Sequence, residues 1–116
     1  RGVDYIKEEA GDECLAVIYS DDIDWCKQSF VGPNIKFVDN NSSDRKGSNL
    51  NDEHLLDLCM MTMCDHLVMA NSTYSWWGGF LNHNKDSIII TPEVWCGPTY
   101  KNNSEEYLRL EEWTVI

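Results

Sequence analysis

The chain has 116 residues, of which 42% are hydrophobic and 25% charged, a composition typical of about one small globular domain. The net charge of −11, with 20 acidic and 9 basic residues and no basic patch, argues against a nucleic-acid-binding protein. No apolar run approaches the ~18 residues that a membrane span needs, and the mixed-charge start lacks the apolar segment of a signal peptide.

Two expectations follow from the same features. The chain begins without a methionine, and we interpret it as a fragment or an excised domain. Because the overall charge repels anions, any anion that the chain binds must be held by local groups.

The five cysteines predict neither a disulfide framework nor a metal site. Their number is odd and they show no paired short spacings. Cys59 and Cys64 lie five positions apart on a predicted helix, which puts them on different faces and argues against a zinc site with His66. We therefore expect no metal and interpret the cysteines as buried thiols. They are Cys14, Cys26, Cys59, Cys64 and Cys96.

The first half of the chain predicts strand, helix, strand and loop. Cys14–Asp22 is a continuous apolar run that ends in acidic residues, which indicates a buried strand. The segment DDIDWCKQSF follows with a helix-start signal, in which Asp21 or Asp22 is the cap. A second strand is predicted at Ile35–Asp39, and residues 40–51 form a polar loop, long enough to be functional or disordered. The residues that can share one face of the helix are Ile23, Trp25, Cys26 and Phe30.

The second half begins with an amphipathic helix over Asn51–His66, capped by Asn51 or Asp52. A third apolar strand is predicted at His66–Ala70. The segment STYSWWGGFLNHN then opens a short helix that ends near Asn82. The apolar residues that recur at helical spacing on the first of these helices are Leu55, Leu56, Cys59, Met60 and Met63.

A fourth strand is predicted at Ser87–Pro92, and the closing SEEYLRLEEWTVI indicates a short terminal helix or an extended tail. Continuous apolar strands that alternate with amphipathic helices predict an α/β fold. Its parallel, Rossmann-like sheet would carry helices on both faces and right-handed crossovers.

The stretch MANSTYSWWGG joins a polar turn to aromatic residues at the end of the third strand. In an open α/β sheet, ligands bind outside the carboxyl ends of the strands, where Ser20–Asp22 and Asn71–Thr73 lie. The second of these segments leads into a helix whose first N–H groups lack intrahelical partners. Hydroxyls of Ser72, Thr73 and Ser75 add donors. The stretch predicts an anion site built without Lys or Arg, and phosphate suits it.

The residues that follow explain how such a turn would be held in place. We expect Trp76 and Trp77 to pack the helix back on the sheet, while Gly78 and Gly79 permit a close approach to a neighbouring element. Ordinary N-capping followed by core aromatics accounts for the same pattern, so both interpretations stay open. The stretch is neither a Walker loop nor the dinucleotide-binding glycine motif.

Four segments, SDDIDWCK, DLCMMTMCDHLVMANSTYSWWGGFLN, IIITPEVW and EEWTVI, together resemble the C-terminal part of the α-1,2-fucosyltransferases, glycosyltransferase family 11. The resemblance extends from about Tyr5 to Ile116, and the Asn-Ser-Thr-Tyr-Ser-Trp-Trp-Gly run is its specific element. Tyr74 stands where the family usually has Phe, and Gly79 replaces a frequent Ala. The family's upstream His-x-Arg-Arg-Gly-Asp-Tyr motif is absent. Because its Arg is the expected pyrophosphate ligand, the chain would hold only half of the donor site.

The resemblance implies that residues 1–116 are the C-terminal, GDP-sugar-binding Rossmann-like half of a GT-B enzyme whose N-terminal half is missing. Such an enzyme transfers L-fucose from GDP-fucose to the 2-hydroxyl of a terminal β-galactoside in a glycan. The reaction inverts the anomeric carbon and needs no metal or cofactor. The compartment stays open, because bacterial members are cytoplasmic and animal members are Golgi membrane proteins.

The same resemblance assigns roles to individual residues. Asp57 would accept hydrogen bonds from guanine N1–H and the guanine amino group, although a helix-surface charge is the alternative. Asp21 and Asp22 resemble an acidic pair that orients the missing Arg, with simple N-capping as the alternative. The phosphate-contacting turn comprises Asn71, Ser72, Thr73, Tyr74 and Ser75. The supporting residues are Asp21, Asp22, Trp76, Trp77 and Gly78.

No catalytic base is assigned. His66 starts a buried strand and is better explained as a satisfied core histidine, and His54 is a weak candidate. Charge stabilisation of the departing GDP by a helix terminus and an Arg can carry more of this reaction than a base. Two other functions stay open: a non-catalytic Rossmann-like nucleotide-binding or regulatory domain, and a transferase for another nucleotide sugar such as GDP-mannose or a UDP-sugar.

Overall fold

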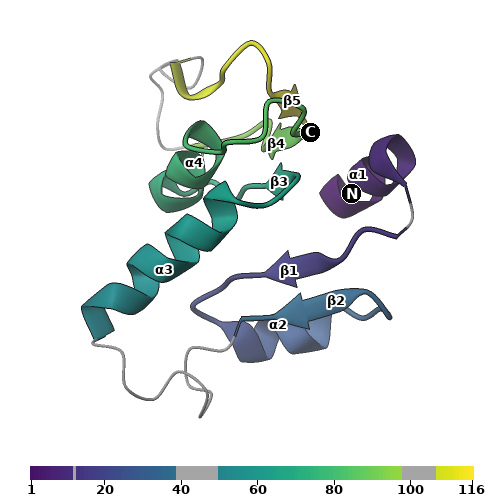
Figure 1. Ribbon diagram of the computed structural model, residues 1–116, viewed down its shortest axis with the longest axis vertical. Coiled ribbons are helices and arrows are strands. Elements are labelled where there is room, and N and C mark those ends of the chain that lie inside the picture. Colours follow the sequence, from purple (N-terminus) through teal and green to yellow (C-terminus); the bar gives the residue numbers. More distant parts are fainter. Residues whose placement is uncertain (12, 39–49, 98–106) are drawn as a thin grey trace. The chain divides into compact units, whose positions relative to one another are not determined.

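The computed structural model describes residues 1–11, 13–38, 50–97 and 107–116, with the side chains of residues 50–53 excepted (Figure 1). The predicted polar loop over residues 40–51 therefore lies almost entirely outside the described residues. The chain divides into two compact units, Val3–Asp57 and Leu58–Ile116, the second of which also includes Arg1 and Gly2. The elements are α1 (Gly2–Ala10), β1 (Ala16–Ile18), α2 (Ile23–Ser29), β2 (Ile35–Phe37), α3 (Leu50–Thr62), β3 (Leu67–Val68), α4 (Thr73–Phe80), β4 (Ile89–Thr91) and β5 (Thr114–Val115).

The unit Val3–Asp57 contains a two-stranded parallel sheet, in which β1 pairs with β2 from Ala16↔Ile35 to Ile18↔Phe37. The predicted cap of α2 is confirmed, because the Asp22 side chain accepts a hydrogen bond of 3.0 Å from the Trp25 N–H. A carboxylate at this position also interacts favourably with the positive end of the helix dipole.

The predicted packing of this unit is only partly confirmed. Cys26 is the buried residue of α2, whereas Trp25 and Phe30 are exposed and meet each other edge to face, with ring centroids 6.1 Å apart. The first strand is shorter and less buried than its apolar run predicted, since Leu15 and Val17 are 52% and 37% exposed. In a two-stranded sheet each strand has a neighbour along one edge only, and its other edge is open to solvent.

Helix α1 was not predicted from the sequence. Its one buried residue is Ile6, so its apolar pattern is too weak to indicate a buried helix face. Asp4 in its first turn and Lys7 in its last turn carry the charges that the helix dipole favours at each end.

The unit Leu58–Ile116 contains a three-stranded parallel sheet in the order β3-β4-β5 (Figure 1). All three residues of the central strand β4 are buried, as in parallel strands that are covered on both faces. The buried core consists of Met69, Ile89, Trp95 and Trp113, with Trp76, Cys96, Leu108 and Leu110 packed against it. The closing segment forms β5, so its predicted terminal helix is wrong and its predicted extended tail is confirmed at Thr114–Val115.

Helix α3 ends at Thr62, four residues before the predicted end at His66, and its orientation also differs from the prediction. It begins at Leu50, so Asn51 and Asp52 lie inside the helix and the prediction that one of them caps it is wrong. The predicted apolar face is exposed: Leu55, Leu56, Cys59, Met60 and Met63 all face solvent. The buried face carries Asp57, Met61 and Thr62 instead, because α4 packs against Met61.

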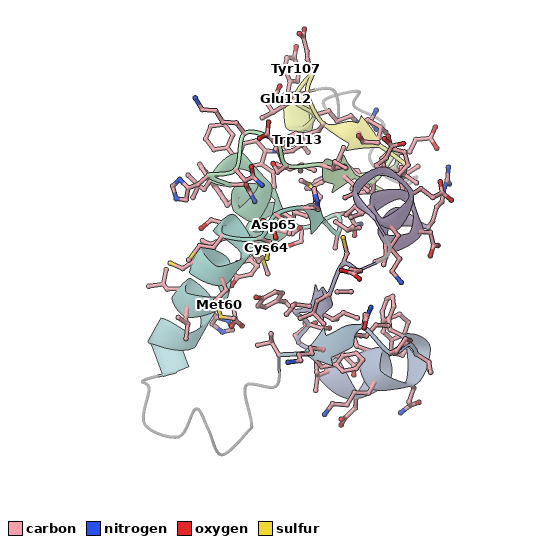
Figure 2. The ribbon with its side chains drawn as sticks, turned by 45° about the vertical axis from the view of Figure 1, so that its right-hand side comes forward. Met60, Cys64, Asp65, Tyr107, Glu112 and Trp113 are labelled. Atoms are coloured by element: carbon pink, nitrogen blue, oxygen red, sulfur yellow. The ribbon has the colours of Figure 1, made fainter. Side chains whose placement is uncertain are left out.

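The five cysteines are free thiols, but the prediction that they are buried holds fully only for Cys26. Cys59 is exposed on α3, and the other three are half-buried. Figure 2 labels Met60 on the last turn of α3 and Cys64 and Asp65 just beyond the end of this helix, and the Cys64 thiol donates to the Met60 carbonyl over 3.4 Å.

Candidate functional site

The turn between β3 and α4 is built as the sequence predicted. Ser72 has an extended backbone, with φ −134° and ψ 132°, and caps α4. Its hydroxyl oxygen accepts a hydrogen bond of 3.2 Å from the Tyr74 N–H, and its carbonyl accepts the first helical hydrogen bond, 3.0 Å from the Trp76 N–H. The cap therefore uses one of the amides that a helix N-terminus otherwise offers to a ligand.

Two of the predicted phosphate-contacting residues stabilise the turn itself. The Ser75 hydroxyl lies 2.9 Å from the carbonyl oxygens of Ala70 and of Ser72, so its single proton is used inside the turn. The Asn71 amide donates to the Trp95 carbonyl over 3.3 Å and ties the turn to the segment that follows β4. The other two hydroxyl residues of the turn are Ser72, which is half-buried, and Thr73, which is exposed.

The two adjacent tryptophans have opposite roles. The Trp76 indole donates to the Leu108 carbonyl over 2.8 Å, and its ring packs against Trp113 with centroids 5.8 Å apart. Trp77 is 48% exposed, so the prediction that both rings hold α4 on the sheet is wrong for Trp77. Trp76 lies on the side of α4 that meets Trp113 and the Leu108 carbonyl, and Trp77, about 100° further round the helix, falls on the exposed side.

The two glycines permit the close approach that the sequence predicted. A Cβ atom on Gly78 would lie 3.2 Å from the Cβ and the sulfur of Met61 on α3. A Cβ atom on Gly79 would lie 2.8 Å from Met69 Cε and 3.2 Å from Ile89 Cγ2. Glycine at both positions therefore lets α4 sit close to α3 and to β4, which fixes the height of its first turn above the sheet edge.

The remaining predicted residues lie in different environments. Asp57 is 6% exposed on α3, which contradicts its alternative interpretation as a helix-surface charge. Asp22 caps α2 and Asp21 is exposed beside it, so capping accounts for one member of the predicted acidic pair. His66 Nδ1 accepts a hydrogen bond of 3.1 Å from the Ile88 N–H, which confirms the structural role predicted for this histidine. His54 is exposed, and we assign no catalytic base among the residues that the structure describes.

Charge and membrane features of the described part add little to this site. Burial raises the pKa of the Cys64 thiol, and the neighbouring Asp65 carboxylate raises it further. Within residues 1–11, 13–38, 50–97 and 107–116, no cluster of His, Cys, Asp and Glu is arranged to hold a metal ion. None of the helices in that part of the chain is both long enough and apolar enough to cross a membrane.

Sequence reasoning missed two residues near the carboxyl edge. Thr91, at the end of β4, is fully buried, and its hydroxyl has no hydrogen-bond partner. Arg109 is half-buried, and its guanidinium donates to the Glu93 carbonyl just beyond β4. The sequence contained one kind of signal for these two residues, their residue type in context: Thr91 is a hydroxyl residue at the end of an Ile-rich run, and Arg109 is a cation in an acidic closing segment.

Comparison with known proteins identifies the family. The family model of glycosyl transferase family 11 matches residues 2–116, and the chain belongs to this family. It is 29% identical over 113 residues to the Escherichia coli O-antigen biosynthesis glycosyltransferase WbnK, a match that covers 97% of this chain and 33% of WbnK. It is 26% identical over 117 residues to an E. coli alpha-1,2-colitosyltransferase, covering 93% of this chain and 36% of that protein. The chain thus spans about a third of the length of the curated relatives it matches, and no solved structure matches it.

Proposed function

We propose that the chain is the donor-binding part of a family 11 glycosyltransferase that transfers L-fucose from GDP-fucose to the 2-hydroxyl of a terminal β-galactoside. Membership of the family supports glycosyl transfer. The parallel strands and intervening helices support a Rossmann-like, C-terminal half of a GT-B enzyme. Because the chain spans about a third of its relatives, the acceptor site and the rest of the donor site would come from further polypeptide.

The observation that carries the proposal is the Ser72-capped turn at the carboxyl end of β3, beside the buried central strand β4. Open α/β sheets bind ligands at this edge. A helix N-terminus offers backbone donors and positive potential, which suit a phosphate, and the hydroxyls of Ser72 and Thr73 add to them.

In the proposed reaction, the acceptor oxygen bonds to the anomeric carbon of fucose as the bond from that carbon to the β-phosphate oxygen breaks. GDP leaves from the opposite face with the electron pair of that bond, so the configuration is inverted, and the proton of the acceptor hydroxyl is released to solvent. Negative charge develops on the β-phosphate as the bond to the sugar breaks. Donors that are already oriented toward that charge stabilise the transition state more than the ground state. Ser72 and Thr73 would bind this phosphate, Trp76 would hold the helix that orients them, and Asp57 would bind the guanine edge.

The relatives leave room for a second donor sugar. One of them is by its name a colitosyltransferase, which favours colitosyl transfer as the second candidate for this chain. Both candidate donors carry a diphosphate that the Ser72-capped turn would bind in the same way. The identity of the sugar must therefore be tested with whole nucleotide sugars rather than with nucleotides.

Base recognition is tested by calorimetric titration of the chain with GDP, ADP and UDP. We expect GDP to bind most tightly and Asp57→Asn to remove that preference, since a hydrogen bond to a charged group contributes about 1.5–3 kcal/mol. Asp65→Asn, an exposed carboxylate just beyond α3, is the matched control and should keep it. Equal binding of the three nucleotides by the unaltered chain would contradict a GDP-sugar site and favour a non-catalytic domain or a UDP-sugar enzyme.

Phosphate recognition is tested by comparing GDP with guanosine. The double variant Ser72→Ala, Thr73→Ala should weaken GDP binding more than guanosine binding, because only GDP carries phosphates. Ser87→Ala, a half-buried serine before β4, is the control. An equal loss for both ligands would mean that the turn has only a structural role.

The chain alone should bind GDP in the millimolar range and show no fucosyl transfer from GDP-fucose to lactose. Exposed helix-terminus contacts contribute only about 0.3–1 kcal/mol each, and each tenfold in affinity requires about 1.4 kcal/mol. Turnover by the purified 116-residue chain, or micromolar binding of GDP, would show that it carries a complete site.

A further inference from the structure

We propose that Arg109 is a phosphate-binding residue of the site at the start of α4, with the Thr91 hydroxyl as a second donor behind the turn. The ligand class is a diphosphate, as in a nucleotide sugar. This inference rests on the proposed function above and assigns to this chain a cation that the predicted site lacked.

The electrostatics of the chain favour such a cation. The net charge is −11, so a diphosphate approaches against an unfavourable overall field. Exposed helix-terminus donors compensate this only weakly. Lys85 cannot help, because it lies in the turn after α4, at the opposite end of that helix from Ser72.

Arg109 is held so that its charge lies at the carboxyl edge of the sheet. The carbonyl of the preceding residue, Leu108, accepts the Trp76 indole N–H over 2.8 Å, which fixes this part of the backbone beside α4. The Arg109 guanidinium extends to the Glu93 carbonyl, two residues beyond the end of β4. Glu93 is itself fixed there, because its N–H donates to the Ile116 carbonyl over 3.0 Å.

The phosphate turn is attached to the same segment. The Asn71 amide, at the start of that turn, donates to the Trp95 carbonyl, two residues from Glu93. The guanidinium and the Ser72-capped turn therefore share the segment 93–95 as a common support. A planar guanidinium in this setting matches the geometry of phosphate oxygens better than an ammonium group does.

Thr91 provides an independent observation that points to a ligand. It is 0% exposed, and its Oγ1 has no hydrogen-bond partner, which is rare for a buried hydroxyl. Alternate strand residues face one side of a sheet, so Thr91 points the same way as Ile89, which packs against the Gly79 position of α4. Because α4 returns from the carboxyl edge toward the amino edge, we infer that Thr91 lies under the N-terminal part of the helix. In the proposed site, its hydroxyl donates to a phosphate oxygen.

The test is calorimetric titration of the 116-residue chain with inorganic pyrophosphate, GDP and guanosine. We expect R109Q to weaken pyrophosphate and GDP about tenfold and to leave guanosine unchanged, as the loss of a charge-assisted hydrogen bond predicts. The pyrophosphate and GDP affinities of R109K should lie between those of the unaltered chain and R109Q, because lysine keeps the positive charge but lacks the planar set of donors of a guanidinium. K85Q removes the same charge far from the turn and should change pyrophosphate binding less than about twofold.

The isosteric variant T91V gives a second measurement. It should weaken pyrophosphate binding severalfold while its melting temperature stays the same or rises, since it removes a buried hydroxyl that has no partner in the free chain. A purely structural Thr91 would lower the melting temperature and leave the ratio of pyrophosphate to guanosine affinity unchanged.

Two results would overturn the inference: no pyrophosphate binding by the unaltered chain at millimolar concentration, or equal effects of R109Q and K85Q. If R109Q does not fold, the ratio of pyrophosphate to guanosine affinity is measured for R109K and T91V instead, and a lower ratio than in the unaltered chain supports the inference. Binding of pyrophosphate that depends on Arg109, without preference for GDP over UDP, would support the anion site and reject the GDP-sugar function. If the chain prefers GDP, and R109Q changes neither that preference nor the affinity for pyrophosphate, the result would support the GDP-sugar function and reject Arg109 as a phosphate-binding residue.

Discussion

The two parallel sheets of this chain begin from similar apolar runs and end in different environments. In the unit Leu58–Ile116, the strand β4 has a neighbour on each edge, and all three of its residues are buried. In the described part of the unit Val3–Asp57, β1 pairs with β2 alone, and Val17 is 37% exposed. An apolar run therefore predicts a strand, whereas the number of neighbours on its edges and faces decides how deeply the strand is buried.

The helices repeat this contrast. Helix α4 is joined to its unit by the Trp76 indole hydrogen bond and by the close approach at Gly79. Helix α2 has one buried residue, Cys26, and its Trp25 is 57% exposed. The Ser72-capped turn lies in the better-packed unit, where rigid neighbours can hold backbone donors in one orientation.

The largest effect is expected from Trp76→Ala, compared with Trp25→Ala in the other unit. Removal of the Trp76 ring should cost about 3–5 kcal/mol of unfolding free energy, because the ring packs on the core and donates to Leu108. Trp25→Ala should cost about 0.5–1.5 kcal/mol, the contribution of its edge-to-face contact with Phe30. Urea unfolding measures both, with Trp77→Ala as a control within α4; equal costs at positions 76 and 25 would remove the contrast between the units.

Strand residues should show the next largest difference. Ile90→Ala in β4 should lower the free energy of unfolding by about 2–5 kcal/mol, because Ile90 is only 3% exposed and its truncation loses buried apolar surface and leaves a cavity. Val17→Ala in β1 should cost no more than about 1 kcal/mol. Thermal unfolding followed by circular dichroism compares the two, and a cost at Val17 as large as that at Ile90 would show that β1 is covered in solution.

The two helix caps, Asp22 in α2 and Ser72 in α4, should contribute similar stability. Each lies in a different unit, so each reports on the local stability of its own unit. Asp22→Ala and Ser72→Ala should each cost about 1 kcal/mol, since each removes the side chain that accepts a hydrogen bond from the first turn. Amide hydrogen exchange should quicken in α2 for the first variant and in α4 for the second. Faster exchange in both helices with either variant would mean that the two units unfold as one.

The smallest effect concerns thiol reactivity. The pKa of Cys64 is raised by burial and by Asp65, so less thiolate is present near neutral pH and alkylation should keep rising at a pH where a small-molecule thiol has levelled off. Asp65→Asn should shift this rise part of the way back. Mass spectrometry after iodoacetamide treatment between about pH 7 and 10 measures both. Cys26, buried in the other unit, should remain unmodified throughout; its modification at the rate of Cys64 would show that its unit opens readily.

Much of the local structure was predictable because its causes are local. The caps at Ser72 and Asp22 follow from residue types within a few positions of each other. The parallel pairing follows from the alternation of apolar strands with helices along the chain. The orientation of α3 was not predictable in this way. Its most continuous apolar stripe is exposed, and Asp57 and Met61 are buried, because the packing of α4 at Gly78 selects the Met61 side.

The sequence by itself determined the family, the order of the main elements and the turn at Ser72, because each depends on short motifs and on hydrophobic periodicity. Only the tertiary structure decided that Trp76 and not Trp77 packs inward, and that the Arg109 guanidinium reaches the Glu93 carbonyl. Such contacts join residues that are far apart in the chain. Their geometry is set by how closely α4 and β4 pack, and no local sequence pattern contains that distance.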